Sequence, residues 1–143
     1  GRTNRTYLIL GDGECQEGQV WEAALFAAQH KLDNLTAFVD WNKRQIDGAV
    51  KDVCDLGDIA GKFESFGYFA QTVDGHDVDA ISKAIKKAKE QKGKPSMIVL
   101  DTVKGKGCSF SEGKPDNHGM PVDKACMEKA VAELEAELEK LSA

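Results

Sequence analysis

Four short apolar segments alternate with helical segments along this chain, and this alternation limits the folds it can adopt. The strand-like segments cover residues 6–10, 35–40, 68–73 and 96–103. The helical segments show apolar residues at helical spacing or a capping Asp, and they cover residues 19–31, 58–66, 78–92 and 123–141. Regular alternation of this kind predicts an α/β fold in which a parallel sheet is covered by helices on both faces.

Length and composition indicate an ordinary globular chain. It has 143 residues, of which 41% are hydrophobic and 30% are charged, and it shows no internal repeat or linker. We therefore predict a single domain over residues 1–143. Its four cysteines include no C-x-x-C pair, so we expect free thiols rather than disulfides or a zinc site.

The charge and the apolar runs exclude two classes of partner. A formal net charge of −5 argues against binding to nucleic acid, which requires clustered Lys and Arg. No apolar run approaches the roughly 20 residues of a transmembrane helix, and residues 1–6 lack the apolar core of a signal peptide. The chain is therefore predicted to be cytoplasmic, with no membrane contact.

An aspartate between two glycines, Asp12, directly follows the first strand-like segment. Gly11 and Gly13 would let a ligand approach the backbone closely, and a carboxylate at a strand end can bind a hard cation. Asn42 follows the second strand-like segment, and two parallel neighbours would bring both side chains to one edge of the sheet. The backbone carbonyl of Arg44 could add a third oxygen. The competing interpretation is that Asp12 only caps a helix.

Five motifs in order resemble the diphosphate-binding domain of transketolase. They are GDGECQEGQVWEAA at 11–24, KLDNLTAFVDWNKRQIDG at 31–48, DGHD at 74–77, KGKG at 104–107 and NHGMP at 117–121. The chain is most similar to the amino-terminal subunit of two-subunit transketolases, and the similarity covers nearly its whole length. The resemblance implies the thiamine diphosphate-binding fold, without the upstream part of this domain.

The resemblance also implies roles for the residues that match these motifs. Asp12, the Asn42 side chain and the Arg44 carbonyl would bind Mg²⁺, with diphosphate oxygens and a water completing its shell. Gly11 and Gly13 would flank the diphosphate of thiamine diphosphate.

Three further residues take roles from the same resemblance. His118 would contact the diphosphate and assist proton transfer at the substrate hydroxyl. Lys104 would neutralise phosphate charge or shape the cofactor pocket, and Glu17 would lie near the subunit interface. The family more often has a smaller residue at Trp41, and this difference is expected to change packing rather than metal binding.

The implied function is transfer of a two-carbon ketol unit between sugar phosphates. The catalytic glutamate of the family comes from a pyrimidine-binding domain, so we expect a pyrimidine-domain partner subunit, in a homo- or hetero-oligomer, and an isolated chain without activity. Two alternatives remain open: a non-catalytic cofactor-binding or assembly fragment, and an enzyme like 1-deoxyxylulose-5-phosphate synthase. The segment 17–21 fits transketolase better than that synthase.

Other polar and apolar features are given structural roles. His76, in a turn before a helix-capping Asp77, is expected to be structural, and the lysines of helix 78–92 are expected to face solvent. The last helix places Val131, Leu134, Leu138 and Leu141 at intervals of three and four residues. This spacing favours a helix that packs on the domain rather than a coiled coil.

Overall fold

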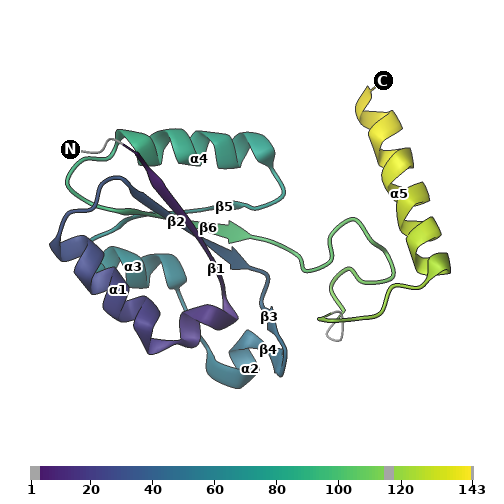
Figure 1. The fold of residues 1–143 in the computed structure, drawn as a ribbon, viewed down its shortest axis with the longest axis horizontal. Helices are drawn as coiled ribbons and strands as arrows, with labels where there is room; N and C mark the ends of the chain where they lie inside the picture. The colour runs from purple at the N-terminus through teal and green to yellow at the C-terminus, as the bar shows by residue number, and fades with distance from the viewer. Residues whose placement is uncertain (1–3, 115–117, 143) are drawn as a thin grey trace.

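A four-stranded parallel sheet forms the centre of the computed structural model, which describes residues 4–114 and 118–142 (Figure 1). Its strands lie in the order β1-β2-β6-β5, and every neighbouring pair is parallel. The strands are β1 (Thr6–Gly11), β2 (Leu35–Trp41), β5 (Phe69–Asp74) and β6 (Ser96–Asp101). The predicted α/β fold is confirmed, although β6 ends two residues before the predicted strand end.

Helices cover both faces of the sheet, as the alternation predicted. Helices α1 (Gly18–Gln29) and α3 (Ile59–Phe66) lie on one face, and α4 (Val78–Glu90) lies on the other (Figure 1). Asp58 and Asp77 accept hydrogen bonds from the first turns of α3 and α4, at 3.0 Å and 2.9 Å. These caps fix where each helix begins.

The chain between β2 and α3 contains structure that the sequence did not predict. Strands β3 (Arg44–Gln45) and β4 (Gly48–Ala49) form an antiparallel hairpin, and a short helix, α2 (Val50–Cys54), follows it. Gly48 has a φ of 138°, a backbone conformation open to glycine. The Asp47-Gly48 turn was predicted, but strands of two residues carry no detectable periodicity.

The core consists of two apolar layers because successive residues of β2 point to opposite faces. Val39 packs with Phe63 of α3, Met97 and Val99, whereas Phe38 packs with Ile98 and α4. Lysines of α4 remain exposed on the outer side of that helix, as predicted. Strand β2 is thus buried on both faces, which explains its continuous apolar sequence.

The register of β1 against β2 positions the strand ends. Gly11 is paired with Asp40, and the backbone N–H of Asp12 donates to the Asp40 carbonyl oxygen at 3.2 Å. Asn42 lies two residues beyond Asp40 on the neighbouring strand. Asp12 and Asn42 are therefore brought to the same edge of the sheet, as the parallel arrangement predicted.

The last helix, α5 (Lys124–Ser142), does not pack on the sheet, so the prediction of a helix docked on the domain is wrong. It has no buried residue and extends away from the other elements (Figure 1). The loop after β6 leaves the carboxyl end of the sheet, so the apolar side chains of α5 reach neither core layer. No helix in the described ranges combines the length and apolarity needed to cross a membrane.

The DGHD motif has a structural basis at Gly75. Its backbone N–H donates to the Asp101 carbonyl oxygen at 2.8 Å, and a Cβ here would overlap Thr102 Cγ2 and lie 3.0 Å from Leu100 Cβ. His76 Nε2 accepts the backbone N–H of Val103 at 2.8 Å. The motif joins the ends of β5 and β6, which confirms the structural role expected of His76.

We expect Gly75→Ala to lower the free energy of unfolding by about 1–3 kcal/mol, because the added methyl overpacks the contact with β6. Urea denaturation followed by circular dichroism measures this change. Gly18→Ala is the matched control, since a Cβ at Gly18 meets no atom within 4 Å. Equal stability of the two variants would contradict the packing argument.

Candidate functional site

All of the site residues predicted from the sequence line one cavity at the carboxyl end of the sheet. The cavity measures about 500 Å³ and lies between the β1 end, the β3–β4 hairpin and the loop after β6. Its lining includes Gly11, Asp12, Gly13, Glu17, Asn42, Arg44, Lys104 and His118. The structure thus groups these residues, while the role of each one stays a prediction.

Asp12 forms the floor of this cavity and is only 1% exposed. Its Oδ1 accepts the backbone N–H of Gly13 at 2.8 Å, and its Oδ2 accepts that of Lys43 at 2.6 Å. Burial raises the pKa of Asp12 above its ordinary value, although these two hydrogen bonds and the charge of Lys104 oppose the shift. Because a carboxylate can accept about four hydrogen bonds, each oxygen keeps capacity for another ligand.

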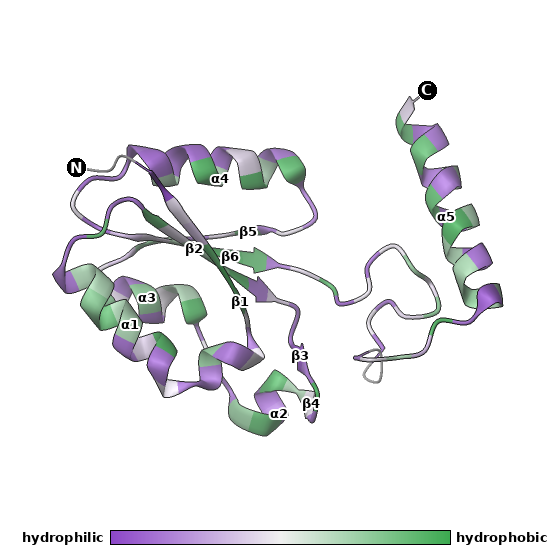
Figure 2. Ribbon diagram, viewed as in Figure 1, coloured by the Kyte–Doolittle hydropathy of each residue, from purple (hydrophilic) through white to green (hydrophobic). Residues whose placement is uncertain are grey.

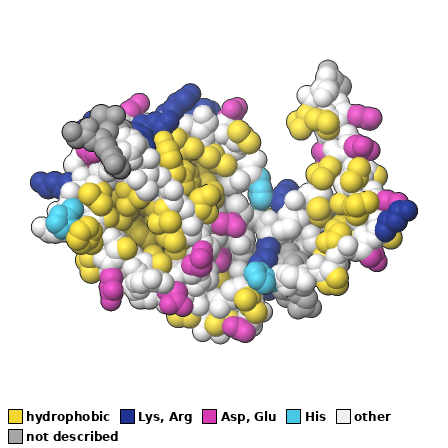
Figure 3. All heavy atoms as spheres, in the orientation of Figure 1, with side chains coloured by type: hydrophobic (Ala, Val, Ile, Leu, Met, Phe, Trp, Pro, Cys, Tyr) yellow, Lys and Arg dark blue, Asp and Glu magenta, His cyan; other side chains and the backbone are white. Residues whose placement is uncertain are grey.

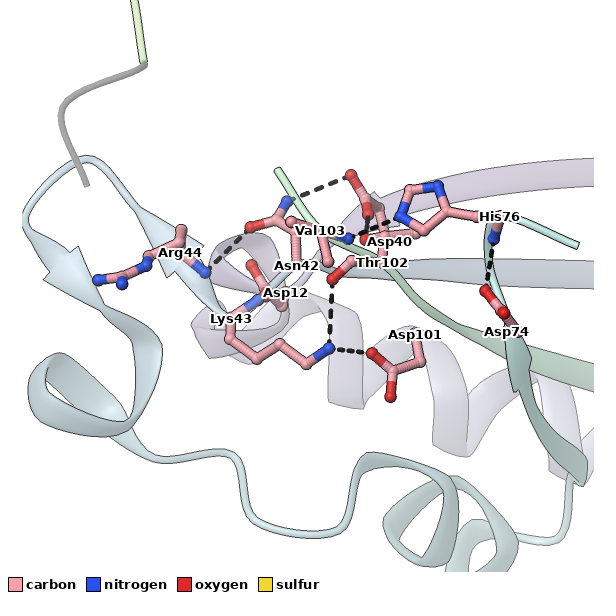
Figure 4. Close-up of polar contacts among 10 residues, drawn as sticks. All are labelled: Asp12, Asp40, Asn42, Lys43, Arg44, Asp74, His76, Asp101, Thr102 and Val103. Carbon is pink, nitrogen blue, oxygen red and sulfur yellow. Dashed lines mark hydrogen bonds and ion pairs between the residues drawn. The ribbon is translucent and has the colours of Figure 1, made fainter. Parts of the chain in front are cut away.

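Lys43 holds Asp12 in place and was missed by the sequence analysis. Its φ of 64° is left-handed, which is uncommon for a residue with a side chain, and this conformation turns its N–H toward Asp12. Its ammonium pairs with Asp101, donates to the Thr102 carbonyl oxygen at 3.2 Å and lies 4.6 Å from the centre of the Trp41 ring (Figure 4). Nothing in the sequence marks a lysine for this conformation.

Asn42 is oriented by two hydrogen bonds beside Asp12 (Figure 4). Its Oδ1 accepts the backbone N–H of Arg44 at 2.9 Å, and its Nδ2 donates to Asp40 Oδ2 at 3.2 Å. Asp40 also accepts a hydrogen bond from the Thr102 hydroxyl. The amide oxygen of Asn42 therefore faces the hairpin side of the cavity.

The oxygens on this wall fit a hard cation only with help from outside the chain. Carboxylate, amide and carbonyl oxygens are the ligands that Mg²⁺ prefers, and Asp12, Asn42 and Arg44 can supply one of each. The described part of the chain contains no group of three His, Cys, Asp or Glu side chains placed to hold a metal. A single buried carboxylate therefore requires further oxygens, which an anionic ligand such as a diphosphate can provide.

Lys104 and His118 form a cationic wall of the same cavity. Lys104 Nζ lies 3.1 Å from His118 Nδ1, although 14 residues separate them in sequence. Since an ammonium group can only donate, Nδ1 is the acceptor and the neutral ring carries its proton on Nε2. Asn117, the first residue of the NHGMP motif, lies outside the described residues.

Four lining residues were missed because they come from segments without a recognised motif role. They are Glu14, Gln45, Ile46 and Asp47. Glu14 Oε2 accepts the backbone N–H of Gly11 at 2.6 Å, and a Cβ on Gly13 would lie only 3.2 Å from Gln45 Cβ. Gly13 is thus small partly because the hairpin packs against it. Ile46 is 75% exposed at the rim of the cavity.

The raised pKa of Asp12 gives a signed pH dependence for the cofactor-free chain. A pKa above 3.8 means that the folded chain binds this proton more tightly than the unfolded chain. The Asp12 contribution to the free energy of unfolding is therefore full below pH 3.8 and falls as the pH rises through the folded pKa. Asp12→Asn lacks this titration, so wild type should lose stability relative to the variant across that window.

Urea denaturation of both proteins from pH 3 to pH 7, without divalent cations, measures this difference. A constant difference is expected above the folded pKa. A wild-type advantage that grows with rising pH would contradict the burial argument.

Comparisons with known proteins identify the family. The family described as "Transketolase, thiamine diphosphate binding domain" matches residues 2–140. A 6-deoxy-6-sulfo-D-fructose transketolase subunit, SqwG, of Clostridium sp. (strain MSTE9) is 51% identical over 134 residues, covering 94% of this chain and 49% of that protein. Human transketolase is 40% identical over 137 residues, covering 94% of this chain and 21% of that protein.

Solved structures agree with the sequence comparisons. Transketolase from Campylobacter jejuni superposes with a TM-score of 0.85 at 34% identity, over 91% of this chain and 20% of that chain. The chain spans about half the length of the subunit-type relatives, and an apulose-4-phosphate transketolase of Actinobacillus succinogenes, 40% identical over 82% of this chain, is matched over 42% of its length. The chain belongs to the transketolase family and comprises its thiamine diphosphate-binding domain.

Proposed function

We propose that this chain binds the diphosphate of thiamine diphosphate together with Mg²⁺, as one part of an enzyme that transfers a two-carbon ketol unit between sugar phosphates. The observation that carries the proposal is the cavity that joins Asp12 and Asn42 to Lys104 and His118. Oxygen donors on one wall and cations on another suit a metal-bound diphosphate.

The metal would be held by Asp12, the Asn42 amide oxygen and the Arg44 carbonyl oxygen. Asn42 Oδ1 already accepts the Arg44 N–H at 2.9 Å, but a carbonyl oxygen has a second lone pair to offer. Lys43 keeps the Asp12 carboxylate fixed through its backbone N–H, so binding requires little rearrangement of the floor. Thiamine diphosphate, when bound, supplies the reactive carbon that accepts the ketol unit.

Lys104 and His118 are assigned charge neutralisation and proton handling. The Lys104 ammonium would oppose the diphosphate charge, and it also holds the His118 ring through Nδ1 at 3.1 Å. His118 Nε2 is then the ring atom that carries a proton, available for exchange with a substrate hydroxyl.

A second subunit would complete the active site. The resemblance to two-subunit transketolases implies a pyrimidine-binding domain that supplies a catalytic glutamate. This chain spans about half the length of its subunit-type relatives. A pyrimidine-domain subunit is the proposed partner, and Glu17, exposed at the cavity rim, is the residue assigned to that interface. A cytoplasmic location is proposed with it.

Asp12→Ala should abolish Mg²⁺-dependent binding of thiamine diphosphate while leaving the fold intact, because it removes the only carboxylate of the proposed metal set. Calorimetric titration of the chain with its partner measures the affinity, and circular dichroism checks the fold. Asp52→Ala, an exposed acid outside the cavity, is the control and should bind normally. Unchanged affinity in Asp12→Ala would remove the metal assignment.

Lys104→Met should raise the dissociation constant for thiamine diphosphate about tenfold, the effect of losing one charge-assisted hydrogen bond. Lys106→Met is the matched control, since Lys106 is paired with Glu112 at 3.1 Å outside this cavity. An equal loss in both variants would indicate a general effect of charge rather than a diphosphate contact.

Ketol transfer should be measured with the partner, Mg²⁺ and thiamine diphosphate. Xylulose 5-phosphate is one donor, and 6-deoxy-6-sulfo-D-fructose is a second because the relative from Clostridium is named for it. No transfer from any donor, with normal cofactor binding, would favour the non-catalytic alternative. A product formed from pyruvate and glyceraldehyde 3-phosphate would instead favour the 1-deoxyxylulose-5-phosphate synthase alternative.

A further inference from the structure

Helix α5 presents an apolar stripe that no described element covers. Its large apolar side chains repeat at intervals of four and three residues, and each is between 46% and 84% exposed. They are Met127, Val131, Leu134, Leu138 and Leu141. Figure 2 shows the green residues recurring along α5, and Figure 3 shows these side chains gathered on the helix, apart from the sheet. A continuous stripe of this kind normally marks an interaction surface.

The borders of this α5 stripe are acidic. The helix has five glutamates and three lysines, a net charge of −2. Glu135 and Glu137 flank the stripe on opposite sides at its centre, and Glu135 has no ion-pair partner among the described residues. A complementary surface would therefore need an apolar groove bordered by Lys or Arg.

The charges also disfavour a second copy of this helix as the occupant. If two α5 helices paired along the stripe, the positions beside the seam would be Glu128, Ala130, Glu135 and Glu137. These positions include no lysine, so neither orientation would place opposite charges across the seam. The occupant is accordingly a different polypeptide.

The placement of α5 connects it to the cavity. Glu133 accepts hydrogen bonds from the Ser109 backbone N–H at 3.0 Å and hydroxyl at 2.5 Å. Leu134 also approaches the same loop, since a Cβ on Gly107 would lie 3.5 Å from Leu134 Cδ2. This loop begins at Lys104, which contacts His118. A protein bound to α5 would therefore lie beside the cationic wall of the cavity.

We infer that the α5 stripe is the docking surface for a second polypeptide, whose complementary surface is an apolar groove rimmed by Lys or Arg. Under the proposed function, on which this inference rests, that polypeptide is the pyrimidine-domain subunit. The stripe would enter the groove, and the flanking glutamates would meet its basic rim. The contact would fix the partner next to the loop that carries Lys104.

The test compares substitutions on two faces of one helix. Leu138→Glu places a charge in the stripe, at a side chain that is 63% exposed and so contributes little to the fold. Ala136→Glu adds the same charge on the opposite face. The probe is the thiamine pyrimidine-domain polypeptide encoded in the same genome, titrated against this chain by calorimetry. We expect Leu138→Glu to weaken binding at least about tenfold and Ala136→Glu to leave it unchanged.

A second pair of variants tests the charge argument. Glu135→Lys reverses a flanking charge and should weaken binding more at low salt than at high salt, whereas Glu139→Lys, farther from the stripe, should have little effect. Circular dichroism checks that every variant keeps its helix content. Binding that none of the stripe variants alters would overturn the inference.

The outcomes separate this inference from the proposed function. Partner binding that resists Leu138→Glu, together with normal ketol transfer, would overturn the docking surface and leave the function standing. Failure of the wild-type chain to bind the pyrimidine-domain polypeptide would overturn both. Self-association of the chain alone, abolished by Leu138→Glu, would assign the stripe to a second copy and overturn the choice of partner.

Discussion

The site depends on the hydrogen bond between the backbone N–H of Lys43 and the buried carboxylate of Asp12. It joins the end of β1 to the segment that follows β2, at 2.6 Å, and it requires a left-handed residue at Lys43. Without it, a 1% exposed carboxylate would lack one of its two partners, and leaving such a group unsatisfied is costly. The same segment positions Asn42 and begins the hairpin that closes the cavity.

The residues beneath Asp12 make its position rigid. Cys15, fully buried under the strand end, has its pKa raised to about 12 by burial and by the charges of Asp12 and Glu14. Its carbonyl oxygen accepts the Trp21 indole N–H at 2.9 Å, and the Trp21 ring lies 5.1 Å from Phe63. The short helix after Asp12 is thereby tied to the apolar core, so the carboxylate rests on a fixed base.

The two ends of the chain's site differ in how they are supported. Asp12 and Asn42 belong to paired strands, whereas Lys104 and His118 belong to a long loop after β6. That loop is held through its own turns and through Glu133 of α5. The position of the cationic wall therefore depends on α5, which connects partner binding to the geometry of the cofactor cavity.

Sequence reasoning succeeded where a residue's environment follows from local pattern. Apolar runs and capping aspartates defined β1, β2, α3 and α4, and the parallel arrangement followed from their alternation. It failed at α5, because an amphipathic stripe shows that a helix will bind an apolar surface but does not show which one. It also failed at the β3–β4 hairpin, whose strands are too short to have a period.

By itself, the sequence determined the α/β fold, the residues that gather at the strand ends and the family to which they belong, because strand ends and their polar residues are encoded within short segments. Only the tertiary structure decided that Lys43 holds Asp12, that Gln45 crowds Gly13 and that α5 stands apart from the sheet. Each of these depends on the path of the chain between elements. A backbone conformation such as the left-handed Lys43 is set by the contacts that it satisfies, and these come from distant parts of the sequence.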